Sequence, residues 1–501
     1  MIFADLLSTG RATDSMKWTD NTNMSMLTDF YEFTMSKGYL DGGNAARIAY
    51  FDLFFRSVPE NGGYAITAGL EQVIDFLQSI RFEPEDIRFL RSQNVFDDPF
   101  LEYLERFHLE CDVWAIPEGT PVFPGEPLVK DRGPVIQAQL VETMLLATIN
   151  HQSLIATKAS RIARAASGKA VFEFGARRAQ GYDAAVLGAR AAYIGGVAAT
   201  SCTIAGQQFG IPVFGTMAHS WIQLFDSEYN AFESYARSFP SETYLLVDTY
   251  DTLRSGVPNA IAVAQKVLEP LGHRLKGIRI DSGDLTYLTR SARQMLDDAG
   301  LTDCKITVSN ALDEYIIRDL LIQGACIDSF GVGERLITSR AEPVFGGVYK
   351  LSAVETNGKV IPKMKISENV GKVTTPCNKE IIRFYDRETG KALADVITVV
   401  GEEIDESKPY EIFDPVQTWK RKTLENFSIR RLLEPILING KCVYERPDIQ
   451  TIRSYCAEQM NTLWDSVLRF ENPQNYYVDL SQELFSIRNE ILHRHRKSNA
   501  Q

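Results

Sequence analysis

The sequence lacks the cysteine patterns of a disulfide framework or a zinc site. Its 501 residues include only seven cysteines, and these form neither a CxxC pair nor a tight Cys/His cluster. An odd number of scattered cysteines is typical of reduced proteins, so we expect a cytoplasmic location. The first 20 residues contain no basic stretch that leads into an apolar run, so we predict no signal peptide.

A long hydrophobic run and an excess of positive charge are also missing. The most apolar stretch, residues 184–206, is rich in Ala and Gly and contains Arg190, so we expect no membrane span. Lys and Arg number 53 against 65 Asp and Glu, which gives a formal net charge of -12. This acidic balance disfavours nucleic acid as a partner. It leaves room for anionic small substrates, because a cleft can be locally basic.

What is present is a globular composition in a chain too long for one core. Apolar residues make up 45% and charged residues 24%, which excludes wholesale disorder, and the length predicts two or three domains. We see no internal repeat. The patterns predict the following elements: a helix from Thr28 or Asp29 to Leu40, a strand at 48–55, a loop-rich β layer at 113–129, helices at 135–149 and 152–167, hairpins at 344–367 with turns at Gly346-Gly347 and Asn357-Gly358, and helices beyond 440.

Between residues 169 and 331, short apolar runs alternate with helical periodicity. Repeated βα units of this kind predict an α/β fold with a parallel sheet, either open or closed into a barrel. The expected strands are 170–174, 197–200, 212–214, 244–247, 277–280, 305–308 and 327–330.

Polar or glycine-rich clusters follow six of these strands. Because the C-terminal ends of barrel strands converge on one rim, we expect the clusters to meet in one active site. They are Arg177 and Arg178; Thr216 and His219; Asp248 and Thr249; Asp281, Ser282, Gly283 and Asp284; Ser309 and Asn310; and Gly331 with Gly333.

Several of these residue types suit phosphate groups. Adjacent Arg177 and Arg178 offer donors for phosphate oxygens, although a surface ion pair is the alternative. Ser282-Gly283 is expected to open a helix, whose free N–H groups attract anions. Gly331-x-Gly333 would let the backbone approach a phosphate, although two glycines are also common in a plain turn.

Acid/base and cation-binding candidates lie among the same clusters. Asp281 and Asp284 suit ribose hydroxyls or a magnesium ion near a pyrophosphate, or they simply cap the next helix. His219 is one of six histidines, and among anion-binding groups it suits acid/base work or phosphoryl transfer. The residue types alone predict a barrel enzyme that acts on a phosphorylated or pyrophosphorylated small molecule.

At these motifs the chain resembles the nicotinate phosphoribosyltransferases, ATP-coupled enzymes of NAD salvage. The matching segments occur in the expected order over roughly 350 residues, and together they are specific. They are TDFYEFTM from Thr28, EFGARRAQG from Glu173, FGIPVFGTMAHSW from Phe209, IRIDSGDL from Ile278, VSNALDE from Val308, FGVGERL from Phe330 and KVTTP from Lys372.

The resemblance implies a fold and an arrangement of domains. It implies an irregular βα-barrel of the type II phosphoribosyltransferase kind, packed on an α+β domain built from both chain ends. We expect residues 1–134 in an N-terminal α+β domain and 135–345 in the barrel with the active-site rim. Residues 346–440 would form a β-rich return to the α+β domain, and residues 441–501 a C-terminal helical extension.

The resemblance also implies roles for individual residues. His219 would be phosphorylated by ATP, and Arg279 with Asp281 would lie beneath the ring and ribose. Nicotinate would contact Tyr31, Thr216, Arg177 and Cys202. Phosphoribosyl pyrophosphate would contact Arg178, Ser282, Gly283, Asp284, Ser309, Asn310, Gly331, Gly333 and Thr374. Glu334 departs from some relatives, because an acid there would repel phosphate unless it points away or meets a cation.

The implied reaction joins nicotinate and phosphoribosyl pyrophosphate, with ATP and Mg²⁺, in a homodimer whose sites are shared. In that dimer Tyr31 would serve the partner's barrel. Cys202 is expected to favour nicotinate, because the nicotinamide-using relatives have an Asp there that would repel a carboxylate. Cys202 is equally suited to a small buried apolar role.

Other functions remain open at the level of sequence. A nicotinamide- or quinolinate-using enzyme would share the scaffold, and a non-catalytic sensor of NAD metabolites would be expected to have broken motifs. An aldolase would need a lysine or a metal cluster at a strand end, and no strand end here offers a lysine.

Overall fold

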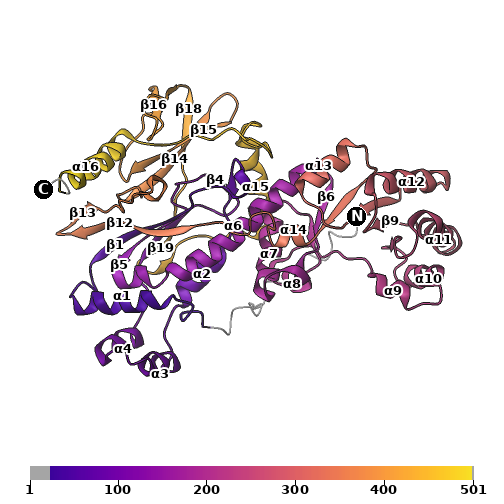
Figure 1. The fold of residues 1–501 in the computed structure, drawn as a ribbon, viewed down its shortest axis with the longest axis horizontal. Helices are drawn as coiled ribbons and strands as arrows, with labels where there is room; N and C mark the ends of the chain where they lie inside the picture. Colours follow the sequence, from indigo (N-terminus) through magenta and orange to yellow (C-terminus); the bar gives the residue numbers. More distant parts are fainter. Residues whose placement is uncertain (1–22, 499–501) are drawn as a thin grey trace.

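The computed structural model describes residues 23–498, and the first 20 residues, where we predicted no signal peptide, lie outside that range. Figure 1 shows an elongated molecule with two parts. One part, which we call the sheet-rich part, contains a seven-stranded and a four-stranded sheet, and the other contains the parallel sheet. Helix α6 (Glu142–Ala165) runs between the two parts. No helix among residues 23–498 is long and apolar enough to cross a membrane.

The parallel sheet is built from the predicted βα units. Its order is β7-β6-β11-β10-β9-β8, and every pairing is parallel. The strands are β6 (Ala170–Glu173), β7 (Ala199–Thr200), β8 (Tyr244–Leu246), β9 (Gly277–Ile280), β10 (Lys305–Val308) and β11 (Ser329–Val332). Val213 adds a single bridge to Thr200. The prediction of a parallel sheet is therefore confirmed.

The two ends of this sheet are Val213 and β8. Among the described residues no strand pairing joins them, so the hydrogen-bonded sheet is open. The Phe214 and Tyr244 rings nevertheless meet edge to face, with centroids 5.5 Å apart. The sheet curves far enough to bring its two ends into side-chain contact.

Helices connect the strands of this sheet and cover it. The helical bounds are η2 (Ala176–Arg178), α7 (Tyr182–Ile194), α8 (Thr203–Phe209), α9 (His219–Gln223), α10 (Glu228–Ser238), α11 (Val257–Val263), α12 (Leu285–Asp298), α13 (Glu314–Ile322) and α14 (Glu334–Ile337).

The other part contains a seven-stranded sheet that joins distant segments of the chain. Its order is β13-β12-β1-β5-β3-β19-β20, with strands from residues 48–134 and from residues 348–442. The bounds are β1 (Ile48–Phe54), β3 (Asp112–Ala115), β5 (Val129–Pro134), β12 (Val348–Thr356), β13 (Lys359–Pro362), β19 (Glu434–Ile438) and β20 (Lys441–Cys442). Helices α1 (Phe30–Asp41), α2 (Leu70–Ser79), α3 (Pro84–Ser92) and α4 (Asp98–Glu105) accompany it.

A second sheet, mixed in strand direction because β21 pairs in parallel with β15, contains the C-terminal strands. The four-stranded sheet β18-β14-β15-β21 comprises β14 (Lys379–Asp386), β15 (Ala392–Val399), β18 (Phe427–Arg431) and β21 (Val478–Leu480). A separate hairpin pairs β16 (Tyr410–Phe413) with β17 (Arg421–Leu424). Helices α15 (Ile449–Thr462) and α16 (Gln482–Ser498) complete this region. Residues beyond 440 are thus mostly helical, but they also supply β20 and β21 to two sheets.

Two local predictions were wrong. The expected helices at 135–149 and 152–167 are a short α5 (Val135–Gln139) and the single long α6. Asn150 lies inside α6 without breaking it, and its side chain accepts a hydrogen bond from the Gly347 N–H, at 2.9 Å. Gly346-Gly347 therefore precedes β12 rather than turning a hairpin. The turn at Asn357-Gly358, between β12 and β13, is confirmed.

Candidate active site

A cavity of about 560 Å³ opens at the C-terminal ends of the parallel strands. Its walls come from all the strand ends that the sequence singled out except the one after β8, where Leu246 itself contributes. The lining residues are Phe174, Arg177, Arg178, Ser201, Gly215, Thr216, Met217, Ala218, His219, Leu246, Arg279, Asp281, Ser309, Asn310, Ala311, Gly331, Gly333, Glu334 and Arg340. The prediction that these clusters converge is confirmed for five of the six.

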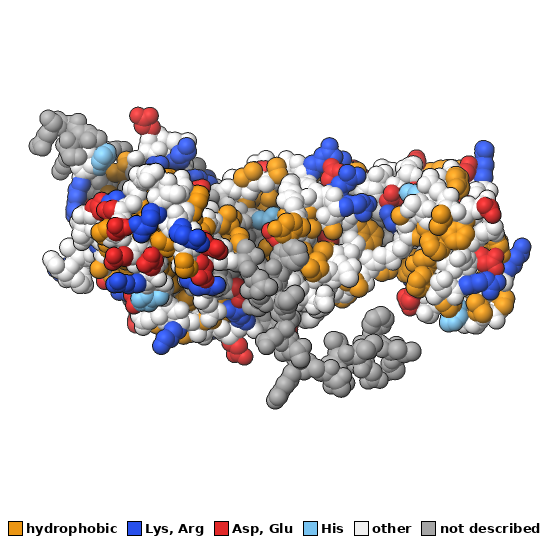
Figure 2. Space-filling view, turned by 90° about the horizontal axis from the view of Figure 1, so that it is seen from below, with side chains coloured by type: hydrophobic (Ala, Val, Ile, Leu, Met, Phe, Trp, Pro, Cys, Tyr) orange, Lys and Arg blue, Asp and Glu red, His pale blue; other side chains and the backbone are white. Residues whose placement is uncertain are grey.

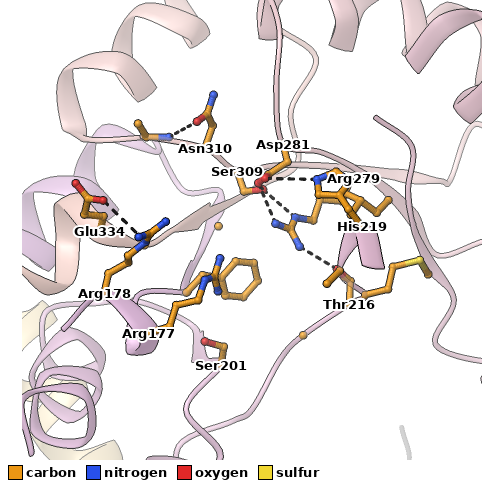
Figure 3. A pocket seen from close by; sticks show the side chains of 18 of the residues that line it. Arg177, Arg178, Ser201, Thr216, His219, Arg279, Asp281, Ser309, Asn310 and Glu334 are labelled. Carbon is orange, nitrogen blue, oxygen red and sulfur yellow. Dashed lines mark hydrogen bonds and ion pairs between the residues drawn. The ribbon is translucent and has the colours of Figure 1, made fainter. Parts of the chain in front are cut away.

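Arg279, at the end of β9, is the centre of the hydrogen-bond network in this cavity (Figure 3). Its Nε donates to Ser309 Oγ at 2.8 Å, and its Nη1 donates to Thr216 Oγ1 at 3.3 Å. Its Nη2 pairs with Asp281 Oδ1 at 2.9 Å. The Ser309 hydroxyl also donates to Asp281. Three strand ends are therefore cross-linked by one guanidinium group, which fixes its position.

The Arg279 guanidinium also lies over an aromatic ring. Its Cζ is 5.6 Å from the centroid of Phe174, at the end of β6. A cation and a ring in this relation attract each other. The wall between β6 and β9 thus presents a positive, planar surface to the cavity.

His219 is the first residue of helix α9, and the residue that orients its imidazole does not itself line the cavity. Nδ1 lies 3.0 Å from Thr249 Oγ1, and Nε2 lies 3.9 Å from Asp281 Oδ2. The side chain is part-exposed, so solvent and small molecules can reach it. The ring is oriented by Thr249 and faces the carboxylate that Arg279 also holds.

The opposite side of the cavity is basic. Arg177 and Arg178 lie on η2, directly after β6, and Figure 3 shows both beside the cavity. Glu334 stands between cations, with Oε1 2.9 Å from Arg340 Nη1 and Oε2 4.0 Å from Arg178 Nε. The acid at this position therefore meets two arginines, one of the conditions under which it would not repel a phosphate.

Two glycines allow close backbone approach here. A Cβ on Gly331 would come within 2.5 Å of the Phe174 ring, and a Cβ on Gly333 within 3.2 Å of the Phe174 carbonyl oxygen. Asn310, which also lines the cavity, has a φ of 124°, a conformation that L residues rarely adopt. Its side-chain oxygen accepts a hydrogen bond from the Ala311 N–H at 2.8 Å.

A buried acid supports the loop that carries the two arginines. Glu173 accepts hydrogen bonds from the Gly175 N–H and from the Thr200 hydroxyl, the latter at 2.7 Å. Its burial raises the pKa of the carboxyl above the ordinary value. Glu173 therefore ties β6 to β7 beneath the cavity without lining it.

The motif after β9 is arranged differently from the prediction. Helix α12 begins at Leu285, and Asp284 is its N-cap, with Oδ1 accepting the Tyr287 N–H at 3.1 Å. Ser282 and Gly283 thus precede the helix rather than opening it. The Ser282 hydroxyl donates to Asp248 Oδ2 at 2.6 Å. None of Ser282, Gly283 and Asp284 lines the cavity.

Two further predicted contacts, Cys202 and Thr374, also lie outside the cavity. Cys202 is the N-cap residue of α8 and packs against the apolar cluster of Val186, Ala189 and Ala205, while its neighbour Ser201 lines the cavity. Thr374 is buried in the sheet-rich part, where its hydroxyl accepts the Lys365 N–H at 2.9 Å. Cys202 is half-buried, and its packing favours the small apolar role that the sequence left open.

Tyr31, on α1, lines a different cavity of about 530 Å³ together with Glu142, Lys350 and Lys363. Figure 1 places α1 at the end of the molecule opposite to β9. The phenol is surrounded by acids: burial and the nearby Glu142 and Glu32 raise the pKa of Tyr31. Within this chain Tyr31 does not meet His219.

Asp248 and Thr249 were predicted at a strand end without a role in the site. Asp248 Oδ2 accepts the Asp281 N–H at 3.0 Å as well as the Ser282 hydroxyl, so it braces the loop that presents Asp281. Phe174 and Arg340 were also missed. The position of Phe174, directly after a strand, was a signal available in the sequence, whereas nothing in the sequence linked Arg340 to the cavity.

We predict that Thr249→Val slows the reaction without removing it. Valine keeps the shape of threonine but cannot form a hydrogen bond with His219 Nδ1, so the imidazole of His219 loses its fixed orientation. Loss of one such hydrogen bond, about 1 kcal/mol, corresponds to a roughly five- to tenfold lower kcat. Steady-state kinetics would measure this, with Thr249→Ser, which keeps the hydroxyl, as the control. Equal rates for the Val and Ser variants would contradict the role.

Comparison with known protein families covers most of the chain. Residues 26–150 match the nicotinate phosphoribosyltransferase (NAPRTase) N-terminal domain, residues 170–399 match the NAPRTase family, and residues 378–488 match the NAPRTase C-terminal domain.

Individual relatives agree with these matches. The nicotinate phosphoribosyltransferase of Bacillus subtilis is 42% identical over 473 residues, which cover 94% of this chain and 96% of that protein. The crystal structure of human nicotinic acid phosphoribosyltransferase superposes with a TM-score of 0.83 at 31% identity, covering 92% of this chain and 99% of the human chain. A nicotinate-nucleotide pyrophosphorylase from Pyrococcus furiosus gives a TM-score of 0.67 at 26% identity, over 90% and 99% of the two chains.

Proposed function

The chain belongs to the nicotinate phosphoribosyltransferase family, and from that premise we propose how its cavity performs the reaction. Nicotinate and phosphoribosyl pyrophosphate combine to nicotinate mononucleotide and pyrophosphate, in a cytoplasmic NAD salvage step. ATP hydrolysis is coupled to this reaction through phosphorylation of His219. The observation that carries the proposal is the position of His219, in one cavity with the Arg279–Asp281–Ser309 network and the Arg177–Arg178 pair.

The chemistry at the ribose follows from the charges around the cavity. The pyridine nitrogen attacks the anomeric carbon as the bond to pyrophosphate breaks, so positive charge develops on the ribose. A carboxylate at Asp281 stabilises that charge, and Arg178 with Arg340 stabilises the departing anion. The Arg279 guanidinium, which lies over the Phe174 ring, would hold the planar, anionic nicotinate. The pyridine nitrogen has no proton to lose, so His219 is not needed as a general base.

Phosphoryl transfer gives His219 its role. The γ-phosphoryl group would pass from ATP to an imidazole nitrogen with release of ADP, and water would later cleave the phosphorus–nitrogen bond to release phosphate. Arg177, Arg178 and the backbone at Gly331 and Gly333 would hold the transferred group. Thr249 keeps the ring oriented for both steps.

Mg²⁺ fits this site only as a companion of the substrates. Among residues 23–498 no group of three or more His, Cys, Asp or Glu side chains could hold a metal ion. Magnesium commonly binds substrate phosphates with one or two carboxylates. Asp281 and Glu334 line the cavity, and Glu334 already pairs with Arg340, so Asp281 is the better candidate. Asp284, the weaker candidate, is engaged as a helix cap. The ion would neutralise charge on the pyrophosphate.

We also propose that the sheet-rich part of one subunit completes the cavity of a partner in a homodimer. The exposed side of α1 carries Tyr31, which is 46% exposed, and Met35. Figure 2 shows hydrophobic side chains gathered at the end of the molecule that carries α9 to α11, where Leu224 is 78% exposed. Apolar surface of this kind is typical of a subunit interface. Within the family's fold, this curved parallel sheet would correspond to the irregular barrel.

A hybrid-dimer experiment tests the shared site. Tyr31→Ala and Asp281→Ala should each be nearly inactive as homodimers, because each removes a group from every cavity. In a mixed dimer one cavity receives both intact residues, so mixing the two variants should restore about a quarter of wild-type activity, as expected for random pairing. Activity would be measured after subunit exchange is verified with two differently tagged chains. No recovery despite verified exchange would contradict the shared site.

A substrate assay tests the proposed function itself. The protein would be incubated with phosphoribosyl pyrophosphate and nicotinate, nicotinamide or quinolinate, with and without ATP, and the mononucleotides measured by mass spectrometry. We expect product from nicotinate, stimulated by ATP, and at least about 100-fold less from the other two, since a favoured charge contact is worth roughly 3 kcal/mol. Equal use of nicotinamide would contradict the specificity, and absence of any product would favour a sensor.

A further inference from the structure

A second groove lies between the hairpin β16–β17 and the segment 472–479, and it has no role in the proposed reaction. Its volume is about 1040 Å³, and loops at residues 57–63 and 123–124 complete its walls. None of the residues that line it also lines the catalytic cavity. We call it the C-terminal groove.

The groove combines two stacked aromatic rings in its wall with a tryptophan that is exposed. Phe123 and Tyr476 stack in its wall, with ring centroids 3.8 Å apart and 10° between the planes. Trp419, at the tip of the hairpin, is 75% exposed. Asp414 Oδ1 accepts the N–H groups of Val416 and Gln417, both at 2.8 Å, so the turn that presents Trp419 is ordered by its own hydrogen bonds.

Two lysines beside Trp419 have ammonium groups without acidic partners. Lys422 Nζ lies 5.4 Å from the Tyr477 ring centroid, and neither Lys422 nor Lys420 forms an ion pair among the described residues. Arg421 differs, because its Nη1 pairs with Glu411 Oε2 at 2.5 Å. The groove therefore offers two unneutralised positive charges next to an aromatic plane.

A buried carboxylate in the same groove has no donor of its own. Asp479, in β21, is 4% exposed and lines the groove, and no N–H or O–H of the described residues donates to its side chain. Burial and the nearby Asp414 raise its pKa to about 6. Asp479 lines the groove without a donor from the chain, so a hydrogen-bond donor on a ligand in the groove would stabilise its carboxylate.

We propose that the C-terminal groove binds a nucleoside phosphate. Its base would stack on Trp419, its phosphate would contact Lys420 and Lys422, and a ribose hydroxyl or base amino group would donate to Asp479. Free phosphate would leave the aromatic surface unused and would be repelled by Asp479. An uncharged apolar ligand would leave both lysines without a counter-charge. Only a ligand with an aromatic plane, an anion and hydrogen-bond donors uses all three features.

Tryptophan fluorescence tests the proposal directly, with AMP as the probe. The chain has five tryptophans, so the signal of Trp419 is the difference between wild type and Trp419→Leu. Because Trp419 is mostly exposed, leucine there should leave folding intact. We expect AMP to quench the wild type saturably and the Trp419→Leu protein at least about threefold less, since the base stacks on the Trp419 ring.

Variants in the groove separate its three features. The pair Lys420→Ala with Lys422→Ala should raise the Kd for AMP about tenfold or more, and Asp479→Asn about fivefold, as expected for lost charge-assisted contacts. Lys408→Ala, an exposed lysine of the same region outside the groove, should leave the Kd unchanged. Arg279→Ala, which disables the catalytic cavity, should also leave the Trp419 signal unchanged.

Control ligands decide between nucleotide and plain anion. With a fluorescently labelled AMP analogue as tracer, adenosine and inorganic phosphate should each displace it at least about tenfold more weakly than unlabelled AMP does, because each satisfies only part of the groove. Competition by phosphate equal to that of AMP would overturn the proposal in favour of a simple anion site. Unchanged AMP affinity in the lysine and Asp479 variants would overturn it altogether.

Discussion

Replacing His219 with alanine is expected to abolish both ATP stimulation and the phosphoryl label on the protein. With γ-³²P-ATP and Mg²⁺, the wild type should acquire an acid-labile, base-stable phosphoryl group, and His219→Ala should acquire none. Product formation at limiting nicotinate should fall by about 10²- to 10³-fold, because an energy-coupled capture step is worth several kcal/mol. Slow transfer without ATP should persist, since the Arg279–Asp281–Ser309 network does not depend on the imidazole.

The control for this variant is a histidine outside the cavity. His108 lies on the surface of the sheet-rich part, beside Glu110. His108→Ala should keep full label and full activity. A label that persists in His219→Ala, or that disappears in His108→Ala, would contradict the assignment of the phosphorylated residue.

Replacing Arg279 with alanine should cause the largest loss of all single substitutions in the cavity. The side chain donates to Thr216 and Ser309, pairs with Asp281 and lies over Phe174, so its removal releases three strand ends at once. Charge-assisted hydrogen bonds are worth about 1.5–3 kcal/mol each. We therefore expect kcat/KM to fall at least about 10³-fold, which corresponds to roughly 4 kcal/mol.

Arg279→Lys separates charge from geometry. Lysine keeps the positive charge but lacks the planar fork that reaches three partners, so kcat/KM should stay at least about 30-fold below wild type. Thermal unfolding would show whether either variant loses stability. A loss below about tenfold for Arg279→Ala, with the fold intact, would rule out Arg279 as the centre of the site.

The sequence determined the parallel sheet and most of its active-site rim. Each βα unit is recognisable from local sequence, as an apolar run followed by polar residues or glycine. Strands β9 and β10 have the bounds that were predicted for them. Because parallel strands in successive βα units share one direction, their C-terminal ends meet on one side. His219, Asp281 and Ser309 could therefore be brought together without knowledge of coordinates, and the family resemblance added Arg279.

What the sequence could not supply are relations between segments that neither period nor spacing links. The Arg279 guanidinium forms hydrogen bonds with Thr216 and Ser309 only because three strand ends converge. For the same reason, tertiary structure shows that Asp248 and Thr249 support Asp281 and His219. It also shows that Cys202 packs in an apolar cluster while its neighbour Ser201 lines the cavity. Local sequence specifies which face of an element is apolar, but which distant side chains meet is decided by how the elements pack.

The sheet-rich part shows the same limit on a larger scale. Strands from residues 48–134 and 348–442 share one sheet, and β21 pairs in parallel with β15 although about 80 residues separate them in the chain. A strand of three residues, such as Val478–Leu480, carries too little pattern to be recognised in a helical context. Tertiary packing made it a strand, because its backbone completes the edge of β15 and Leu480 enters the core with Cys377, Ile397 and Leu484.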